Sequence, residues 1–178
     1  MNFLPTKVDG VFEVHVEPHF DERGSFARTW CRNEFMLNGL NPNLAQCSIS
    51  FNASRGTLRG IHFQNTPHCE TKLVRCTRGA IYDVAVDLRS DSPTFRMWTG
   101  ATLTAANRQA LYIPEGCAHG FLTLQDETEV FYQISEFYHP GAGRGVRWND
   151  PAFGIVWPEE VHVIADRDRT YPDFSMTP

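Results

Sequence analysis

Three stretches of the sequence carry more titratable side chains than a strand or a turn requires. The first, Thr57-Leu-Arg-Gly-Ile-His-Phe-Gln64, places Arg59, His62 and Gln64 among apolar residues. Because an imidazole titrates near neutrality, His62 is suited to remove a proton from a carbon acid or to bind a metal ion. In a regular strand His62 and Gln64 share one face and Arg59 lies on the other, but a bulge at Gly60 would re-aim one of them.

The second stretch, Pro114-Glu-Gly-Cys-Ala-His-Gly-Phe121, has the spacing Pro-x-Gly-x-x-His, which resembles the second motif of cupin β-barrels. Metal-binding cupins also carry His-x-His in their first motif, and here that stretch reads His62-Phe63-Gln64. One imidazole ligand is therefore missing from a site that needs three or four. His62, His119 and a carboxylate would still form a triad, so a metal-dependent cupin, either an oxygenase or a non-catalytic binding barrel, is the alternative interpretation.

The third stretch, Phe20-Asp-Glu-Arg-Gly-Ser-Phe26, has the composition of a β-turn and presents Arg23. Taken singly, each polar residue has an ordinary explanation: a core histidine, a surface ion pair or a strand aromatic. Together they exceed what a β core accepts without a ligand. The set is Arg23, Arg59, His62, Lys72, His119 and Tyr132.

Short β-like runs between Gly- and Pro-containing turns must position these groups. They predict a mainly β fold, a jelly-roll sandwich or barrel of the cupin type with a few short helices. The run Ile81–Leu88 alternates and predicts a half-buried strand with Asp83 and Asp87 on its polar side. Further expected elements are strands at Val11–Val16, Lys72–Cys76, Ala110–Ile113 and Val130–Phe137, a turn at Pro114–Gly116, a helix near Asn33–Asn38 ended by Gly39, and a short helix with an extended tail after Trp157.

The composition indicates one ordinary globular domain, residues 1–178, with 42% hydrophobic and 21% charged residues. The formal net charge of −5 argues against nucleic acid or an anionic membrane as a partner. The five cysteines form no Cys-x-x-Cys pair, and the N-terminus has no apolar leader. These features predict unpaired thiols and a cytoplasmic location. Cys117, two residues before His119, is interpreted as a small buried hydrophobe.

Read in order, the motifs resemble the dTDP-4-dehydrorhamnose 3,5-epimerases, a family of dimeric cupins. The resemblance runs from about Val11 to Asp168. The matching stretches are Phe20-x-Asp/Glu-x-Arg-Gly-x-Phe26, Leu58–Gln64, Lys72-Leu-Val, Asp83-Val-Ala-Val-Asp-Leu-Arg89, Ile113-Pro-x-Gly-x-Ala-His-Gly-Phe121, Tyr132, Trp148-Asn-Asp-Pro151 and Ile155-Val-Trp-Pro158.

The resemblance implies epimerisation beside the ketone of a nucleotide-diphosphate-linked 4-keto-6-deoxy sugar, through an enolate. It makes His62 the base and Asp168 the carboxylate that polarises it. Lys72 becomes the donor to the C4 oxyanion, and Tyr132 the acid on the opposite face. No cofactor and no metal are expected, because the ketone is the electron sink.

Substrate binding is also inferred from the family. Arg23 and Arg59 would bind the diphosphate, which suits guanidinium groups. His119 would donate to the sugar, and Phe26 and Tyr138 would flank the nucleobase.

Four positions depart from the family pattern. The family's Gln-x-Asn reads Gln46-Cys47-Ser48, its Ser and Lys before the dyad aspartate are Ala165 and Arg167, and its Glu two residues after Phe26 is Arg28. A carboxylate accepts from thymine N3–H, whereas a guanidinium would donate to cytosine N3. A CDP-linked sugar is therefore the alternative substrate.

Whether C3, C5 or both centres are inverted stays open, although Tyr132 favours both. A binding protein without turnover is a further alternative, against which the full acid–base set argues. The family implies a homodimer in which N-terminal strands are exchanged or added to the partner's sheet.

Overall fold

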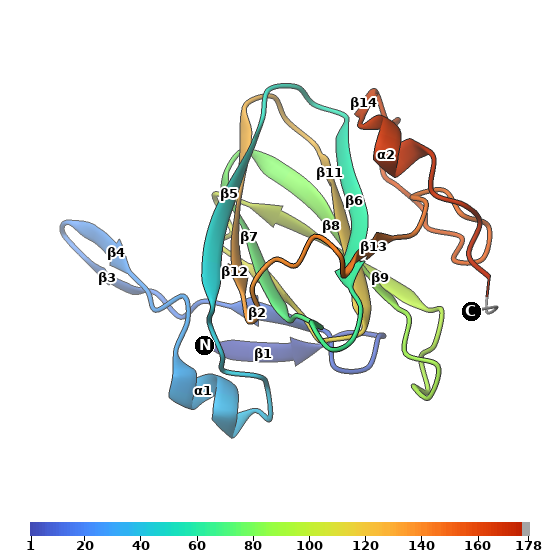
Figure 1. The fold of residues 1–178 in the computed structure, drawn as a ribbon. Coiled ribbons are helices and arrows are strands. Elements are labelled where there is room, and N and C mark those ends of the chain that lie inside the picture. The colour runs from blue at the N-terminus through green and yellow to red at the C-terminus, as the bar shows by residue number, and fades with distance from the viewer. Residues whose placement is uncertain (176–178) are drawn as a thin grey trace.

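Two antiparallel sheets face each other in the computed structural model, which describes residues 1–175 (Figure 1). In spatial order the first sheet consists of β1 (Asn2–Pro5), β2 (Phe12–His15), β10 (Ala110–Ile113), β7 (Lys72–Arg78), β12 (Thr128–Ile134) and β5 (Gln46–Asn52). The second consists of β13 (Gly143–Gly145), β6 (Thr57–Gln64), β11 (Cys117–Thr123), β8 (Ala80–Asp87) and β9 (Trp98–Thr104), and β14 (Val163–Ile164) pairs with β6 in parallel. The predicted antiparallel sandwich is confirmed.

Three small elements lie outside the two sheets. Strands β3 (His19–Asp21) and β4 (Gly24–Phe26) form a hairpin that projects away from the body of the molecule (Figure 1). Helix α1 (Arg32–Leu37) confirms the expected early helix, and α2 (Asp166–Arg169) is the expected short C-terminal one. The last three residues of the expected tail lie outside the described residues.

Period-two alternation decides which side chains enter the space between the sheets. On β7, Val74 and Cys76 join the central core, whereas Leu73 packs on the outside near α1. Lys72 shares the inward face of Val74 by the same alternation. Strand β12 turns Tyr132 inward in the same way. The sequence therefore places an ammonium and a phenol inside the sandwich.

The prediction that the strand at residues 81–88 is half-buried was wrong. Ala85 of strand β8 packs in the core between the sheets, and Val84 and Val86 on its other face pack against Val146 and Phe153. Asp83 and Asp87 are both 0% exposed. The polar side of this strand faces the interior rather than water.

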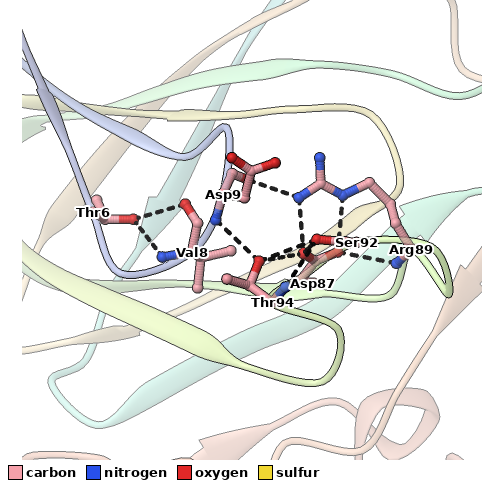
Figure 2. A network of polar contacts seen from close by, with 7 residues as sticks. All are labelled: Thr6, Val8, Asp9, Asp87, Arg89, Ser92 and Thr94. Atoms are coloured by element: carbon pink, nitrogen blue, oxygen red, sulfur yellow. Dashed lines mark hydrogen bonds and ion pairs between the residues drawn. The ribbon is translucent and has the colours of Figure 1, made fainter.

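Asp87 anchors the loop between β1 and β2 to the barrel (Figure 2). Its carboxylate accepts hydrogen bonds from Arg89 Nε at 2.8 Å and from Thr94 Oγ1 at 2.7 Å. Thr94 Oγ1 in turn accepts the Asp9 N–H at 3.0 Å, and Arg89 Nη2 donates to the Asp9 carbonyl at 2.6 Å. A buried carboxylate with this many donors holds the N-terminal loop in place.

All five cysteines are free, and Cys117 is buried. Burial raises the pKa of Cys117 to about 12, which supports its interpretation as a small apolar residue. Within residues 1–175, no helix has the length and apolar character that a bilayer crossing requires.

Candidate active site

A cavity of about 570 Å³ lies between the two sheets. Its walls come from β5, β6, β7, β11 and β12 and from residues 163–168. Seven of the predicted site residues line it: Ser48, Arg59, His62, Lys72, His119, Tyr132 and Asp168. The structure thus brings the four predicted catalytic residues into one compartment.

His62 and Asp168 form a dyad. His62 Nε2 lies 2.7 Å from Asp168 Oδ1, and the second oxygen of Asp168 accepts the Gly60 N–H at 3.0 Å. Burial alone would raise the pKa of Asp168, but the hydrogen bonds from His62 and Gly60 outweigh it and hold that pKa below its ordinary value. Since an ionised carboxylate only accepts, the proton is assigned to Nε2, which leaves Nδ1 of His62 as the basic atom.

A bulge in β6 turns Arg59 and His62 toward the same cavity. Strand β11 advances two residues from Phe121 to His119 while β6 advances three from Arg59 to His62. The bulge expected at Gly60 is therefore present. Gly60 has φ +118°, and a Cβ at this position would lie 2.6 Å from the Gly120 Cα. Only glycine fits this approach of the two strands.

Lys72 is held from two sides. Its Nζ lies 2.7 Å from Glu70 Oε1 and donates to the His62 carbonyl at 3.4 Å. The side chains of Lys72 and Glu70 are each only 10% exposed. The ammonium therefore stands beside the backbone of His62 in a place where water screens charge poorly.

Tyr132 and His119 also line the cavity. Their ring centroids are 5.9 Å apart in an edge-to-face arrangement. Burial raises the pKa of Tyr132, and the nearby carboxylate of Asp83 acts in the same direction, so the phenol stays protonated at neutral pH. His119 Nε2 lies 2.7 Å from Asp83 Oδ1, and desolvation raises the pKa of that aspartate.

A second cavity of about 350 Å³ continues from the first and shares Ser48, His62 and Lys72 with it. It contains three more of the predicted binding residues, Gln46, Tyr138 and Arg167. Arg167 Nε donates to Tyr171 Oη at 2.7 Å. Together the two cavities give space for a ligand with two parts.

Three predicted binding residues do not reach either cavity. Arg23 is paired with Asp21 on the exposed hairpin, and Phe26 is 77% exposed. Arg28 Nη1 donates to Glu34 Oε1 at 2.8 Å in a separate hollow at the base of the hairpin. Within one chain, the hairpin points away from the site that these residues were expected to complete.

Sequence reasoning missed three residues that orient the site. Asp83 was placed on the solvent side of its strand, although a carboxylate in an otherwise apolar run is a signal for an interior partner. Asn52 accepts from Arg59 Nε at 2.7 Å, while its amide donates to two backbone carbonyls at 3.2 Å each. Glu70 lies in a loop, where no periodicity indicates which way a side chain points.

The histidines of the cavity do not form a metal site with the donors around them. Within the described residues, no group of three or more His, Cys, Asp or Glu side chains is arranged to hold a metal ion. The Nε2 atoms of both His62 and His119 are occupied by carboxylates at 2.7 Å. The donor set does not favour the metal-dependent alternative.

A cupin-type sandwich whose interior presents a His–Asp dyad, an ammonium and a phenol belongs to the acid–base enzymes. A family model described as dTDP-4-dehydrorhamnose 3,5-epimerase matches residues 5–176. The chain belongs to this family, so the resemblance seen in the sequence is confirmed.

Individual relatives agree with the family. The dTDP-4-dehydrorhamnose 3,5-epimerase of Methanothermobacter thermautotrophicus is 44% identical over 99% of this chain and 96% of its own. A crystal structure of the enzyme from Bacillus anthracis with TDP and PPi bound has a TM-score of 0.92 at 38% identity, covering 97% of this chain and 99% of that chain. A dTDP-4-dehydrorhamnose 3-epimerase of Streptomyces niveus is 38% identical over 95% of this chain and 82% of its own.

Proposed function

We propose that this protein epimerises dTDP-4-dehydro-6-deoxyglucose at C3 and C5 and so forms dTDP-4-dehydrorhamnose. Its membership of the family supports the reaction. One observation carries the assignment of roles: base, oxyanion donor and acid line a single cavity of about 570 Å³. A matched set of this kind is what inversion beside a ketone requires.

His62 removes the proton from the ring carbon beside the ketone. Nδ1 accepts it, and Asp168 stabilises the imidazolium that results. The electron pair of the C–H bond moves into the C4 carbonyl, which becomes an enolate oxygen. Because the ketone itself takes up this charge, the proposed reaction uses no cofactor.

Lys72 and Tyr132 complete the inversion. The Lys72 ammonium donates a hydrogen bond to the enolate oxygen, where a preorganised charge in a dry site stabilises the transition state most. The Tyr132 phenol delivers a proton to the opposite face of the carbon, and the electron pair returns from oxygen to form the new C–H bond. The phenolate and the imidazolium then exchange a proton through solvent to restore the enzyme.

The remaining predicted residues would bind the substrate. Arg59 takes a phosphate oxygen, since Asn52 occupies its Nε and leaves terminal N–H groups for a ligand. His119, whose Nε2 is paired with Asp83, would hydrogen-bond to the sugar through Nδ1. Gln46, Ser48, Tyr138 and Arg167 line the second cavity, which we assign to the nucleoside diphosphate.

A homodimer would bring the hairpin residues to the site. Arg23 and Phe26 cannot reach the cavity of their own chain, because they lie on a hairpin that projects away from it (Figure 1). In a two-fold dimer the hairpin of one chain would cover the cavity of the other. Arg23 would then join the diphosphate site, and Phe26 would stack on the nucleobase opposite Tyr138.

The nucleobase is tested by a thermal-shift panel of dTDP, UDP, CDP and GDP. Arg28, the basis of the CDP alternative, is paired with Glu34 in this structure, which leaves its guanidinium less free to read a base. We expect the largest stabilisation with dTDP. A larger shift with CDP would reject the dTDP-linked substrate and favour the alternative.

Turnover itself is tested by NMR in deuterated water with dTDP-4-dehydro-6-deoxyglucose. We expect deuterium at both C3 and C5 and the appearance of dTDP-4-dehydrorhamnose. Label at C3 alone would indicate a 3-epimerase, the activity for which the Streptomyces niveus relative is named. Absence of any label would reject the epimerase.

We assign the enzyme to the cytoplasm, where five free thiols stay reduced.

A further inference from the structure

The loop between β6 and β7 places a carboxylate inside the active site. Glu70 Oε1 lies 2.7 Å from Lys72 Nζ, and both side chains are only 10% exposed. Most salt bridges on protein surfaces contribute little, but this one is shielded from water on the wall of the second cavity. A shielded carboxylate next to the reacting ammonium affects where that ammonium stands.

Glu70 is itself fixed by Gln64. Its second oxygen accepts from Gln64 Nε2 at 3.1 Å and shares the two N–H groups of this amide with the His68 and Phe137 carbonyls; Gln64 is 4% exposed. The orientation of this amide is determined, because Gln64 Oε1 accepts the His139 N–H at 2.7 Å and Nε2 donates to the Phe137 carbonyl at 3.1 Å. The carboxylate is thus attached to the loop that carries Tyr138 and cannot follow Lys72 freely.

The hydrogen bonds of Lys72 then leave one direction open. An ammonium has three N–H donors. Glu70 Oε1 holds the ammonium as an ion-pair partner at 2.7 Å, and the His62 carbonyl accepts one weak hydrogen bond at 3.4 Å. N–H groups of Lys72 therefore remain for a ligand atom in the cavity that Lys72 lines.

We infer that Glu70 is a positioning residue, which directs the free N–H of Lys72 at the ketone oxygen of the substrate. This inference rests on the proposed function of the site. Glu70 also compensates the charge of Lys72, so that the ammonium can stand in a poorly hydrated cavity before substrate arrives. Its contribution acts on kcat, because the charge that Lys72 stabilises exists only in the transition state and the enolate.

The test compares Glu70→Ala and Glu70→Gln with the wild type in steady-state turnover. A misplaced ammonium should lower kcat of Glu70→Ala about 100-fold. KM should stay within about twofold, since ground-state binding is unchanged. Glu70→Gln keeps the volume and a hydrogen-bond acceptor but not the charge. Its kcat should therefore lie between that of the wild type and that of Glu70→Ala. Glu115→Ala is the matched control, because Glu115 is exposed and makes one hydrogen bond, to Asn41.

Combination with Lys72→Ala distinguishes positioning from a general structural role. If Glu70 acts through Lys72, Glu70→Ala should change kcat less than about twofold in the Lys72→Ala background. An equal loss in both backgrounds, or a loss in KM alone, would overturn the inference. Circular dichroism and melting temperature identify a variant that fails to fold, in which case Glu70→Gln decides. Failure of the wild type to turn over any nucleotide-linked keto sugar would instead reject the proposed function.

Discussion

His62 Nε2 and Asp168 Oδ1 lie 2.7 Å apart although 106 positions separate the two residues in the chain. The contact depends on the C-terminal segment, in which β14 pairs with β6 and carries α2 onto the edge of the cavity. Asp168 is 4% exposed, and it is bound a second time by the Gly60 N–H. The carboxylate therefore sets both the tautomer and the direction of the imidazole.

Replacement of Asp168 by Asn should keep the fold and remove most of the activity. The Asn amide would present either a donor or a neutral acceptor to Nε2, so the imidazole loses the ionised partner that makes Nδ1 basic. We expect kcat to fall roughly 10³- to 10⁴-fold, as for the equivalent change in hydrolase triads. Turnover assays that are quenched at set times and analysed by NMR measure this loss. A kcat within tenfold of the wild type would show that His62 does not need the dyad.

Replacement of Tyr132 by Phe should separate proton removal from inversion. Burial raises the pKa of Tyr132, so the phenol is the form that acts at neutral pH, and Phe removes its proton without changing the ring. We expect the rate of product formation to fall about 10²- to 10³-fold. Exchange of the ring C–H with deuterated water should persist, because His62 remains. Equal loss of exchange and inversion would argue against Tyr132 as the acid of the second step.

The period-two alternation of side chains along a strand predicted the inner wall of the site, because this alternation depends only on neighbours in the chain. Lys72 and Tyr132 follow period two into the sandwich, and the bulge at Gly60 explains why Arg59 joins His62 on one face. The half-buried prediction for β8 failed for a related reason. Alternation gives the two faces of a strand but not what covers them, and here Val146 and Phe153 cover the outer face of β8.

Contacts that depend on loop packing or on how distant strands are placed could not be predicted in this way. Glu70 has no periodic neighbour that points it at Lys72, and Asn52 binds Arg59 from another strand. For the hairpin residues, the family resemblance predicted a role that the structure of one chain does not show. The resemblance assigned Arg23 to the site, but a single chain keeps it outside the cavity.

Co-expression of Arg23→Ala with His62→Ala should restore activity if the hairpin serves the partner's cavity. A mixed dimer contains one site with an intact His62 from the first chain and an intact Arg23 from the second. The other site of the mixed dimer carries both defects, so we expect purified mixed dimers to show about half of the wild-type activity. Each variant alone should show much less. The measurement is turnover of purified mixed dimers that carry two different affinity tags.

The matched control is co-expression of His62→Ala with Lys72→Ala. Both residues line the cavity of their own chain, so each mixed dimer has a defect in both sites and should remain inactive. Activity in this control would show that rescue does not require a residue supplied by the partner chain. Lack of recovery in the Arg23 experiment would place the hairpin outside the catalytic unit.

Replacement of Asp87 by Asn should destabilise the protein in a pH-dependent manner without altering catalysis. Burial alone would raise the pKa of Asp87, but the hydrogen bonds from Arg89, Ser92 and Thr94 lower it to about 2 (Figure 2). The unfolded chain has a pKa of about 3.9 at this residue. Since the folded pKa is the lower one, the ionised carboxylate stabilises the fold above about pH 4, and this contribution is lost as the pH falls toward 2. We expect Asp87→Asn to lower the free energy of unfolding by about 2 kcal/mol at pH 6 and by roughly half as much at pH 3.

Urea titrations at both pH values measure the difference, and kcat at pH 7 should match the wild type because Asp87 does not line the cavity. A deficit that stays constant between pH 6 and pH 3 would mean that packing of the loop, rather than the charge of Asp87, anchors the N-terminal segment.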